Sequence, residues 1–110
     1  MDAVKTWDHA GMTCVMRRGF RGIPCGYVAL PEGHPLHGVE YQDMDEWPDV
    51  HGGVTWTGVL VGCSELGWLI GFDMGHNGDF TNNPWRCVRT EEECVAETNR
   101  LAEQMAERGE

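Results

Sequence analysis

The chain has 110 residues, of which 41% are hydrophobic, and its 18 acidic and 8 basic residues give a formal net charge of −10. This length allows one domain with a modest core, and the apolar content excludes a disordered chain. The excess of acidic side chains disfavours non-specific binding to DNA, RNA or anionic lipid, because each of these ligands requires a positive surface.

Composition also bears on where the protein acts. No apolar run approaches the ~20 residues that a membrane-spanning helix needs, so we expect no membrane partner. Residues 1–5 lack the basic region and following apolar stretch of a secretory signal, which favours the cytoplasm. The five cysteines are odd in number and form no CxxC pair, so they indicate neither a complete disulfide framework nor a zinc knuckle.

Residues 1–11 form a polar lead-in, and the first predicted pair of strands follows it. Residues 12–18 and 23–30 are rich in strand-forming side chains. The residues between them include two glycines, which adopt turn conformations at low cost. We therefore expect an antiparallel hairpin over 12–30. The Pro- and Gly-rich stretch at 31–38 then ends the second strand, because proline removes backbone donors.

Two further strands are predicted in the second half of the chain. Residues 53–61 alternate in the manner of a half-buried strand. Residues 68–72 are almost all apolar, which indicates burial on both faces and a central place in the sheet. Residues 39–44 fit a short helical turn, and residues 74–89, rich in Gly, Asn and Pro, are expected to form a long loop.

The last segment, 90–108, is predicted to be an amphipathic helix. Thr90 and Glu93 have the spacing of a capping box, in which each satisfies a free backbone amide of the first turn. Six side chains recur at helical spacing on one face, which we expect to pack on the sheet: Cys94, Val95, Thr98, Leu101, Ala102 and Met105.

Together these elements predict one α+β domain over 1–110. It would consist of a small antiparallel sheet of about four strands with one C-terminal helix packed on it. The sheet and its loops would occupy residues 12–73.

Two polar stretches stand beside the predicted strands of the second half. One is His-Gly-Gly-Val-Thr at 51–55, and the other is Asp-Met-Gly-His-Asn-Gly-Asp at 73–79. The glycines of the second stretch argue against a helix, so its polar side chains would leave a strand on a loop and converge. The candidate ligand-binding residues are His34, His51, Gly52, Gly53, Thr55, Asp73, His76 and Asp79.

The first interpretation is direct recognition of a small polar ligand. Successive amides, such as those of Gly52 and Gly53, can form an anion-binding nest, and a tryptophan can stack on a ring. Clustered aspartates would repel a phosphate unless a cation intervened. Arg17, Arg18 and Arg21 form a local basic patch. A phosphate ligand therefore requires either a bound metal or one of these arginines beside the pocket.

Two other interpretations remain open. His51, Asp73 and His76 form a common ligand set for a divalent transition metal, the one cofactor that the pattern suggests. In such a metal-dependent hydrolase Asp79 would orient or deprotonate the bound water. Alternatively, the chain is an acidic module that binds a protein partner, and the same residues only cap turns and satisfy buried polar groups.

Four motifs carry a resemblance to a known family: CGYV at 25–28, PxGHPxxG at 31–38, VHGGxT at 50–55 and GFDxxHxGD at 71–79. In this combination the chain resembles a family of small phage- and prophage-associated proteins without an established activity. Met74 stands where that family often has a cysteine, which argues against a cysteine ligand there. The resemblance implies no catalytic residue.

The same resemblance implies a phage-encoded accessory protein that works in the host cytosol. Such proteins often act against host processes, including defence signalling by small nucleotides. The expected partner is therefore a small polar ligand, with a nucleotide signal as one form of it, or a host protein. The expected role is modulation of host physiology or defence.

Overall fold

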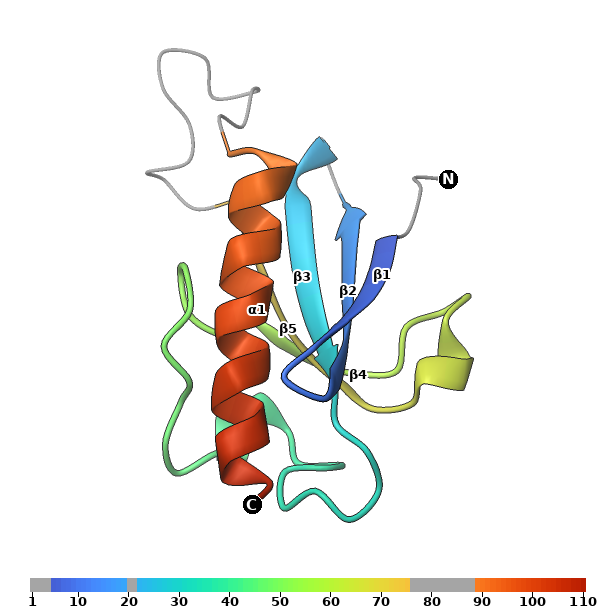
Figure 1. Cartoon of the computed structure of the whole chain (residues 1–110), viewed down its shortest axis with the longest axis vertical. Coiled ribbons are helices and arrows are strands. Elements are labelled where there is room, and N and C mark those ends of the chain that lie inside the picture. Colours follow the sequence, from blue (N-terminus) through green and yellow to red (C-terminus); the bar gives the residue numbers. More distant parts are fainter. Residues whose placement is uncertain (1–4, 20–21, 76–88) are drawn as a thin grey trace.

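The computed structural model describes residues 5–19, 22–75 and 89–110. It has two layers: an antiparallel five-stranded sheet in the order β1-β2-β3-β5-β4, and one helix packed across one face (Figure 1). The elements are β1 (Lys5–His9), β2 (Met12–Arg18), β3 (Pro24–Ala29), β4 (Trp56–Gly58), β5 (Leu69–Asp73) and α1 (Glu91–Arg108), with short 3-10 helices at Tyr41–Asp43 and Ser64–Leu66.

The predicted α+β architecture is confirmed, but the sheet has five strands rather than about four. The additional strand is β1, which lies within the expected polar lead-in and pairs with β2. As an edge strand it has one neighbour only, so much of its surface stays exposed and its sequence is polar. Trp7 is the exception: its indole N–H donates to Asn99 Oδ1 on α1 at 2.8 Å.

The strand predicted at 53–61 is much shorter in the structure. Only Trp56–Gly58 pairs with β5, and the chain leaves the sheet after Gly58, whose φ is 150°. By contrast, the apolar run near residue 70 does form an internal strand. β5 lies between β3 and β4, and four of its five residues are buried.

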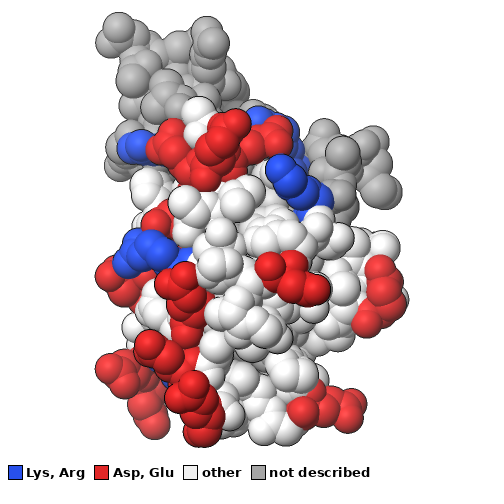
Figure 2. Space-filling view, viewed as in Figure 1, with Lys and Arg blue, Asp and Glu red and all other residues white. Residues whose placement is uncertain are grey.

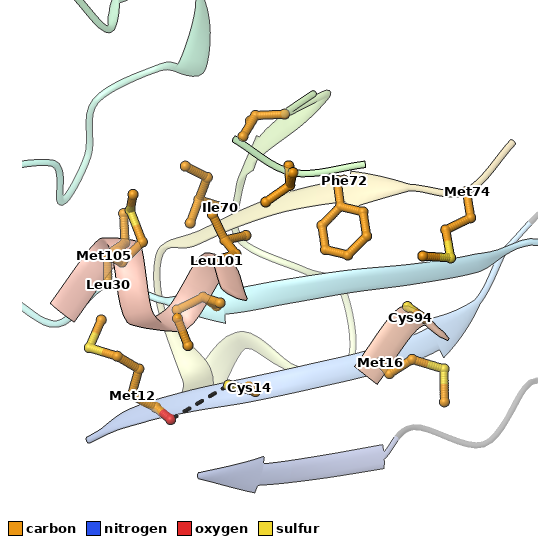
Figure 3. Close-up of a cluster of buried hydrophobic side chains, with 14 of the residues drawn as sticks. Met12, Cys14, Met16, Leu30, Ile70, Phe72, Met74, Cys94, Leu101 and Met105 are labelled. Carbon is orange, nitrogen blue, oxygen red and sulfur yellow. Dashed lines mark hydrogen bonds between the residues drawn. The ribbon is translucent and has the colours of Figure 1, made fainter. Parts of the chain in front are cut away.

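The main core lies between the sheet and α1 (Figure 3). Met12, Cys14 and Met16 from β2 share this cluster with Cys94, Leu101 and Met105 of the helix, and Met16 lies beside Cys94. Phe72 of β5 and Met74, just beyond that strand, extend the cluster. Gly26 of β3 allows this close approach, because a Cβ atom there would lie 2.1 Å from Thr98 Oγ1. A smaller cluster on the opposite face of the sheet contains Val15, Tyr27, Leu60 and Leu69.

Helix α1 begins at the predicted capping box. The Glu93 amide donates to Thr90 Oγ1 at 3.1 Å, and the Thr90 amide donates to Glu93 Oε1 at 3.2 Å. Of the six residues predicted on its apolar face, Val95 alone is only half-buried. None of the helices in the described ranges is long and apolar enough to cross a membrane.

Acidic side chains are prominent on the helix side of the molecule (Figure 2). Some are paired: Arg100 contacts Asp49 and Glu97, each at 2.9 Å, and Arg18 contacts Glu91 at 3.1 Å. Arg18 and Arg100 lie at the surface, where solvent screens such pairs, so these pairs add little to stability.

Candidate functional site

A cavity of about 460 Å³ lies on the face of the sheet opposite α1. Side chains alternate between the two faces of a strand, and the register places Arg17, Cys25, Tyr27 and Asp73 on the face that does not carry the helix. The lining residues are Arg17, Cys25, Tyr27, Thr55, Trp56, Val59, Leu60, Val61, Phe72 and Asp73.

Three of these residues form a row across the sheet. Arg17 of β2 pairs with Cys25 of β3, which pairs with Asp73 of β5. Neighbouring strands lie ≈ 4.8 Å apart, so the Cα atoms of Arg17 and Asp73 are separated by about 10 Å. No ion pair joins these two side chains. The cavity therefore holds a cation and an anion apart, with a neutral thiol between them.

Arg17 is an incompletely satisfied cation. Its Nε atom is buried and has no hydrogen-bond partner, and the side chain makes no ion pair with any residue in the described part of the chain. Its neighbour Arg18 points to the other face and pairs with Glu91. Leaving a buried donor unpaired costs about 1–3 kcal/mol. Arg17 itself is only half-buried and lines the cavity, so the exposed part of its side chain can pair with a ligand that supplies an acceptor.

Asp73 is held in place by short-range contacts. Its Oδ2 atom accepts a hydrogen bond from the Thr55 hydroxyl at 3.1 Å, and its Oδ1 atom accepts one from the Gly75 amide at 2.9 Å. The Thr55 amide in turn donates to Gly71 O at 3.0 Å, which fixes the chain just before β4. Two of the predicted site residues, Thr55 and Asp73, thus meet at the cavity.

Aromatic and aliphatic side chains form the rest of the wall. Trp56 and Tyr27 make an edge-to-face contact with ring centroids 5.6 Å apart and planes at 86°. At the rim, Val59 is 49% exposed and Val61 is 97% exposed. The cavity therefore has a polar row along the sheet and an apolar rim beside it.

Two titratable groups of the wall, the Cys25 thiol and the Tyr27 hydroxyl, keep their protons at neutral pH. Burial raises the pKa of the Cys25 thiol, and the charge of Asp73 raises it further. Burial likewise raises the pKa of Tyr27, although the nearby Arg17 side chain opposes this shift. Reactive cysteines have lowered pKa values, so Cys25 has the properties of a contact residue rather than a nucleophile.

The His-Gly-Gly turn lies elsewhere, against α1. The His51 amide donates to Glu97 Oε1 at 2.8 Å, and the Gly53 amide donates to Val50 O at 2.9 Å. Gly52 and Gly53 have φ angles of 70° and 82°, which explains the two glycines, because other residues adopt this region at a cost. None of these residues lines the cavity on the opposite face.

His34 is also remote from the cavity. Its Nδ1 atom accepts from the Leu36 amide at 3.0 Å, so Nε2 carries the proton and donates to Met105 O at 2.8 Å. This histidine therefore joins the 31–38 loop to the last turns of the helix. It has a structural role in the fold.

The remaining predicted site residues, His76 and Asp79, lie outside the described residues. The proposed metal set of His51, Asp73 and His76 is therefore only partly placed. Within the ranges that the structure covers, no group of three or more His, Cys, Asp or Glu side chains is arranged to hold a metal ion.

Cys25 and Tyr27 are cavity residues that were not among the predicted site residues, and Arg17 was predicted only as part of a basic patch. The sequence feature that could have indicated these three residues is the alternation of side chains between the two faces of the first hairpin. Arg17, Cys25 and Tyr27 alternate with Met16, Gly26 and Val28, which belong to the helix-facing surface.

Comparisons with known proteins gave no match. No protein-family model matches the chain, and no curated protein or solved structure is significantly similar to it. The fold and the cavity define a small α+β protein with a lined cavity on the face of the sheet opposite α1.

Proposed function

We propose that this protein binds a small polar ligand in the cavity on the face of the sheet opposite α1. The observation that carries the proposal is Arg17, a half-buried cation that lines the cavity and forms no ion pair with any described residue. Thr55 and Asp73 add fixed polar groups beside it, and Trp56 adds an aromatic wall. A few fixed polar groups among aromatic and aliphatic side chains are typical of small-molecule sites.

The consequence of binding that we propose is modulation of host physiology or defence. That part rests on the resemblance to phage-associated proteins. A nucleotide signal is one ligand that fits the requirement for an arginine beside the pocket, because Arg17 supplies the cation that a phosphate needs. A host protein that binds the acidic surface is the competing partner.

The test is a titration of the ¹⁵N-labelled protein with a panel of nucleotides, nucleosides, amino acids and organic acids, followed by amide shifts in NMR spectra. We expect a ligand to shift resonances of residues around the cavity. Arg17→Met should weaken that binding roughly 10-fold or more, because a hydrogen bond to a charged group is lost.

Arg18→Met is the matched control, since it removes the same charge from the same strand but on the other face. It should leave the affinity within about 2-fold, because a distant exposed charge acts weakly through solvent. Shifts confined to the helix side, or equal effects of the two substitutions, would contradict the proposal.

The metal-dependent hydrolase makes a different prediction. If His51, Asp73 and His76 hold an ion, elemental analysis of untagged protein should give about one equivalent of Zn, Mn or Fe, and EDTA should lower the melting temperature. If the cavity binds its ligand directly, EDTA should change neither the melting temperature nor the affinity. The two proposals are therefore separated before any ligand is known.

A further inference from the structure

Two charged side chains line the cavity among the described residues, and they differ in what they offer a ligand. Asp73 accepts hydrogen bonds from Thr55 and Gly75 and has a further interaction besides these two. Arg17 is half-buried and forms no ion pair with any described residue. The charge that this part of the lining leaves for a ligand to compensate is therefore positive and single.

The side chains next to Arg17 on the sheet are neutral. Its partner across the strand pair is Cys25, whose thiol keeps its proton, and Tyr27 follows on the same face of β3. In such surroundings less water screens a charge, so a guanidinium pairs more strongly with an anionic group. Its planar fork can also hold two oxygens of one carboxylate or phosphate at once.

A ligand with several negative charges is a poorer match. The described lining offers no second cation, so further charges would leave water without an opposite charge beside them. The chain's formal charge of −10 adds a long-range repulsion of polyanions. Both effects favour a ligand with one negative charge.

Another part of the cavity wall is apolar and faces solvent. In the described part of the chain the exposed large hydrophobic side chains are Trp47, Val59 and Val61, and the two valines both line this cavity. Trp56 and Leu60 lie in the same wall. Covering exposed apolar side chains removes their surface from water, so this wall favours a ligand with an apolar body.

We infer that the cavity binds an amphipathic monoanion, with its anionic group on Arg17 and its apolar ring or chain against Trp56, Val59 and Val61. This inference rests on the proposed function and names its ligand class. Two kinds of compound supply the shared chemistry. One is a carboxylic acid with an aromatic or aliphatic body, and the other is a nucleotide with a single phosphodiester charge, whose base is the planar body.

The first arm of the test uses probes that separate the charge from the ring. Indole-3-propionate has both, indole-3-propionamide keeps the ring without the charge, and propionate keeps the charge without the ring. Calorimetric titration of the wild-type protein should give indole-3-propionate the highest affinity, by roughly 10-fold over each of the others. The second arm compares 3′,5′-cyclic AMP with neutral adenosine and with ATP, and cyclic AMP should bind most tightly of the three.

Two changes to the cavity should act on different parts of the ligand. Arg17→Met should bring the affinities of the indole acid and its amide to within about 2-fold of each other, and should leave that of the amide unchanged, which shows that the cavity is intact. Val59→Thr combined with Val61→Thr should weaken binding of the indole acid roughly 3-fold or more but keep its preference over the amide.

The chain offers a matched control for each change. Arg18→Met removes the same charge from β2 on the opposite face, and Val95→Thr makes the same substitution at a half-buried position of α1. Both variants should keep the wild-type affinities. Thermal melting of every variant checks that it is folded.

The outcomes distinguish the inference from the proposed function. Tight binding of indole-3-propionate alone assigns the carboxylic-acid source, and tight binding of cyclic AMP alone assigns the nucleotide source. If the amide, adenosine or ATP binds at the cavity as tightly as its monoanionic counterpart, the inference is overturned while ligand binding at the cavity stands. The inference is also overturned if Arg17→Met keeps the preference for the acid, if the valine substitutions leave its affinity unchanged, or if none of the six probes binds at millimolar concentration.

Discussion

His34 shows how one side chain can fix the end of an element. Its two ring nitrogens contact the Leu36 amide and the Met105 carbonyl, so His34→Ala removes two hydrogen bonds from a half-buried position. We expect the free energy of unfolding to fall by about 1–2 kcal/mol in urea titrations. The control is His9→Ala, which removes an exposed pair with Glu103 and should lower it by less than about 1 kcal/mol. Equal losses in the two variants would show that the contacts of His34 are not stabilising.

At this scale the candidate site was predicted in part. Thr55 and Asp73 were selected because they stand beside glycines at the ends of strands, and the structure joins them by a hydrogen bond. His51 was assigned to the same site, but its amide contacts Glu97, 46 residues further along the chain. Such a contact depends on where the helix docks. No local sequence pattern encodes that position. The sequence therefore could not predict that the amide of His51 contacts the helix while Thr55 and Asp73 line the cavity.

The packing of α1 on the sheet depends on the absence of a side chain at one position of β3. A Cβ atom at residue 26 would lie 2.1 Å from Thr98 Oγ1 and 2.7 Å from Phe72 Cε1. Gly26→Ala should therefore lower the free energy of unfolding by roughly 1–3 kcal/mol, because the helix must move away from the sheet. Chemical denaturation with circular dichroism detection measures this change.

Gly19→Ala is the control, since its nearest neighbour would be the Cys25 sulfur at 3.4 Å, and it should have a much smaller effect. Adding Thr98→Ala to Gly26→Ala removes the nearest of the clashing atoms. The double variant should be more stable than the sum of the single changes predicts. Strict additivity would show that the helix does not press on residue 26.

Elements with a strong internal pattern were predicted well. The helix begins with a capping box, the first hairpin contains a glycine turn, and the buried strand near residue 70 is an apolar run. The errors lie at the edges of the sheet. β1 was missed because its sequence is polar: it is an edge strand, held by β2 and by contacts of Trp7 and His9 with α1. β4 ends early because the chain turns away at Gly58.

The buried thiols make the stability of the whole molecule sensitive to alkali. Burial raises the pKa of Cys14 to about 11 and that of Cys94 to about 12, from an ordinary value of 9.0. Above about pH 9 the thiols of the unfolded chain lose their protons, whereas those of the folded chain keep them until the pH reaches their raised pKa values. The folded state therefore becomes less stable between about pH 9 and about pH 12. Below about pH 9 both states keep the protons, and these thiols add no pH dependence.

Urea midpoints measured at about pH 8 and about pH 11 test this expectation. Cys94→Ala should lose less stability between the two conditions than the wild-type protein does. Cys63→Ser is the control variant, because Cys63 is only half-buried. It should lose as much stability between the two pH values as the wild-type protein does. Identical alkaline losses in all three proteins would rule out the thiols as the cause.

The position of α1 in the chain also has a consequence for synthesis on the ribosome. The surface that it covers is complete once β5 has been made, and it carries Met12, Val28 and Phe72. Its cover, Leu101 to Met105, is made after β5, so this apolar surface has no helix over it until these residues have left the ribosome. A nascent chain that stalls before the helix would present it to chaperones, proteases or other nascent chains. The sheet therefore cannot be covered before α1 has been made, and the yield of folded protein in the cell depends on how quickly the helix follows the sheet.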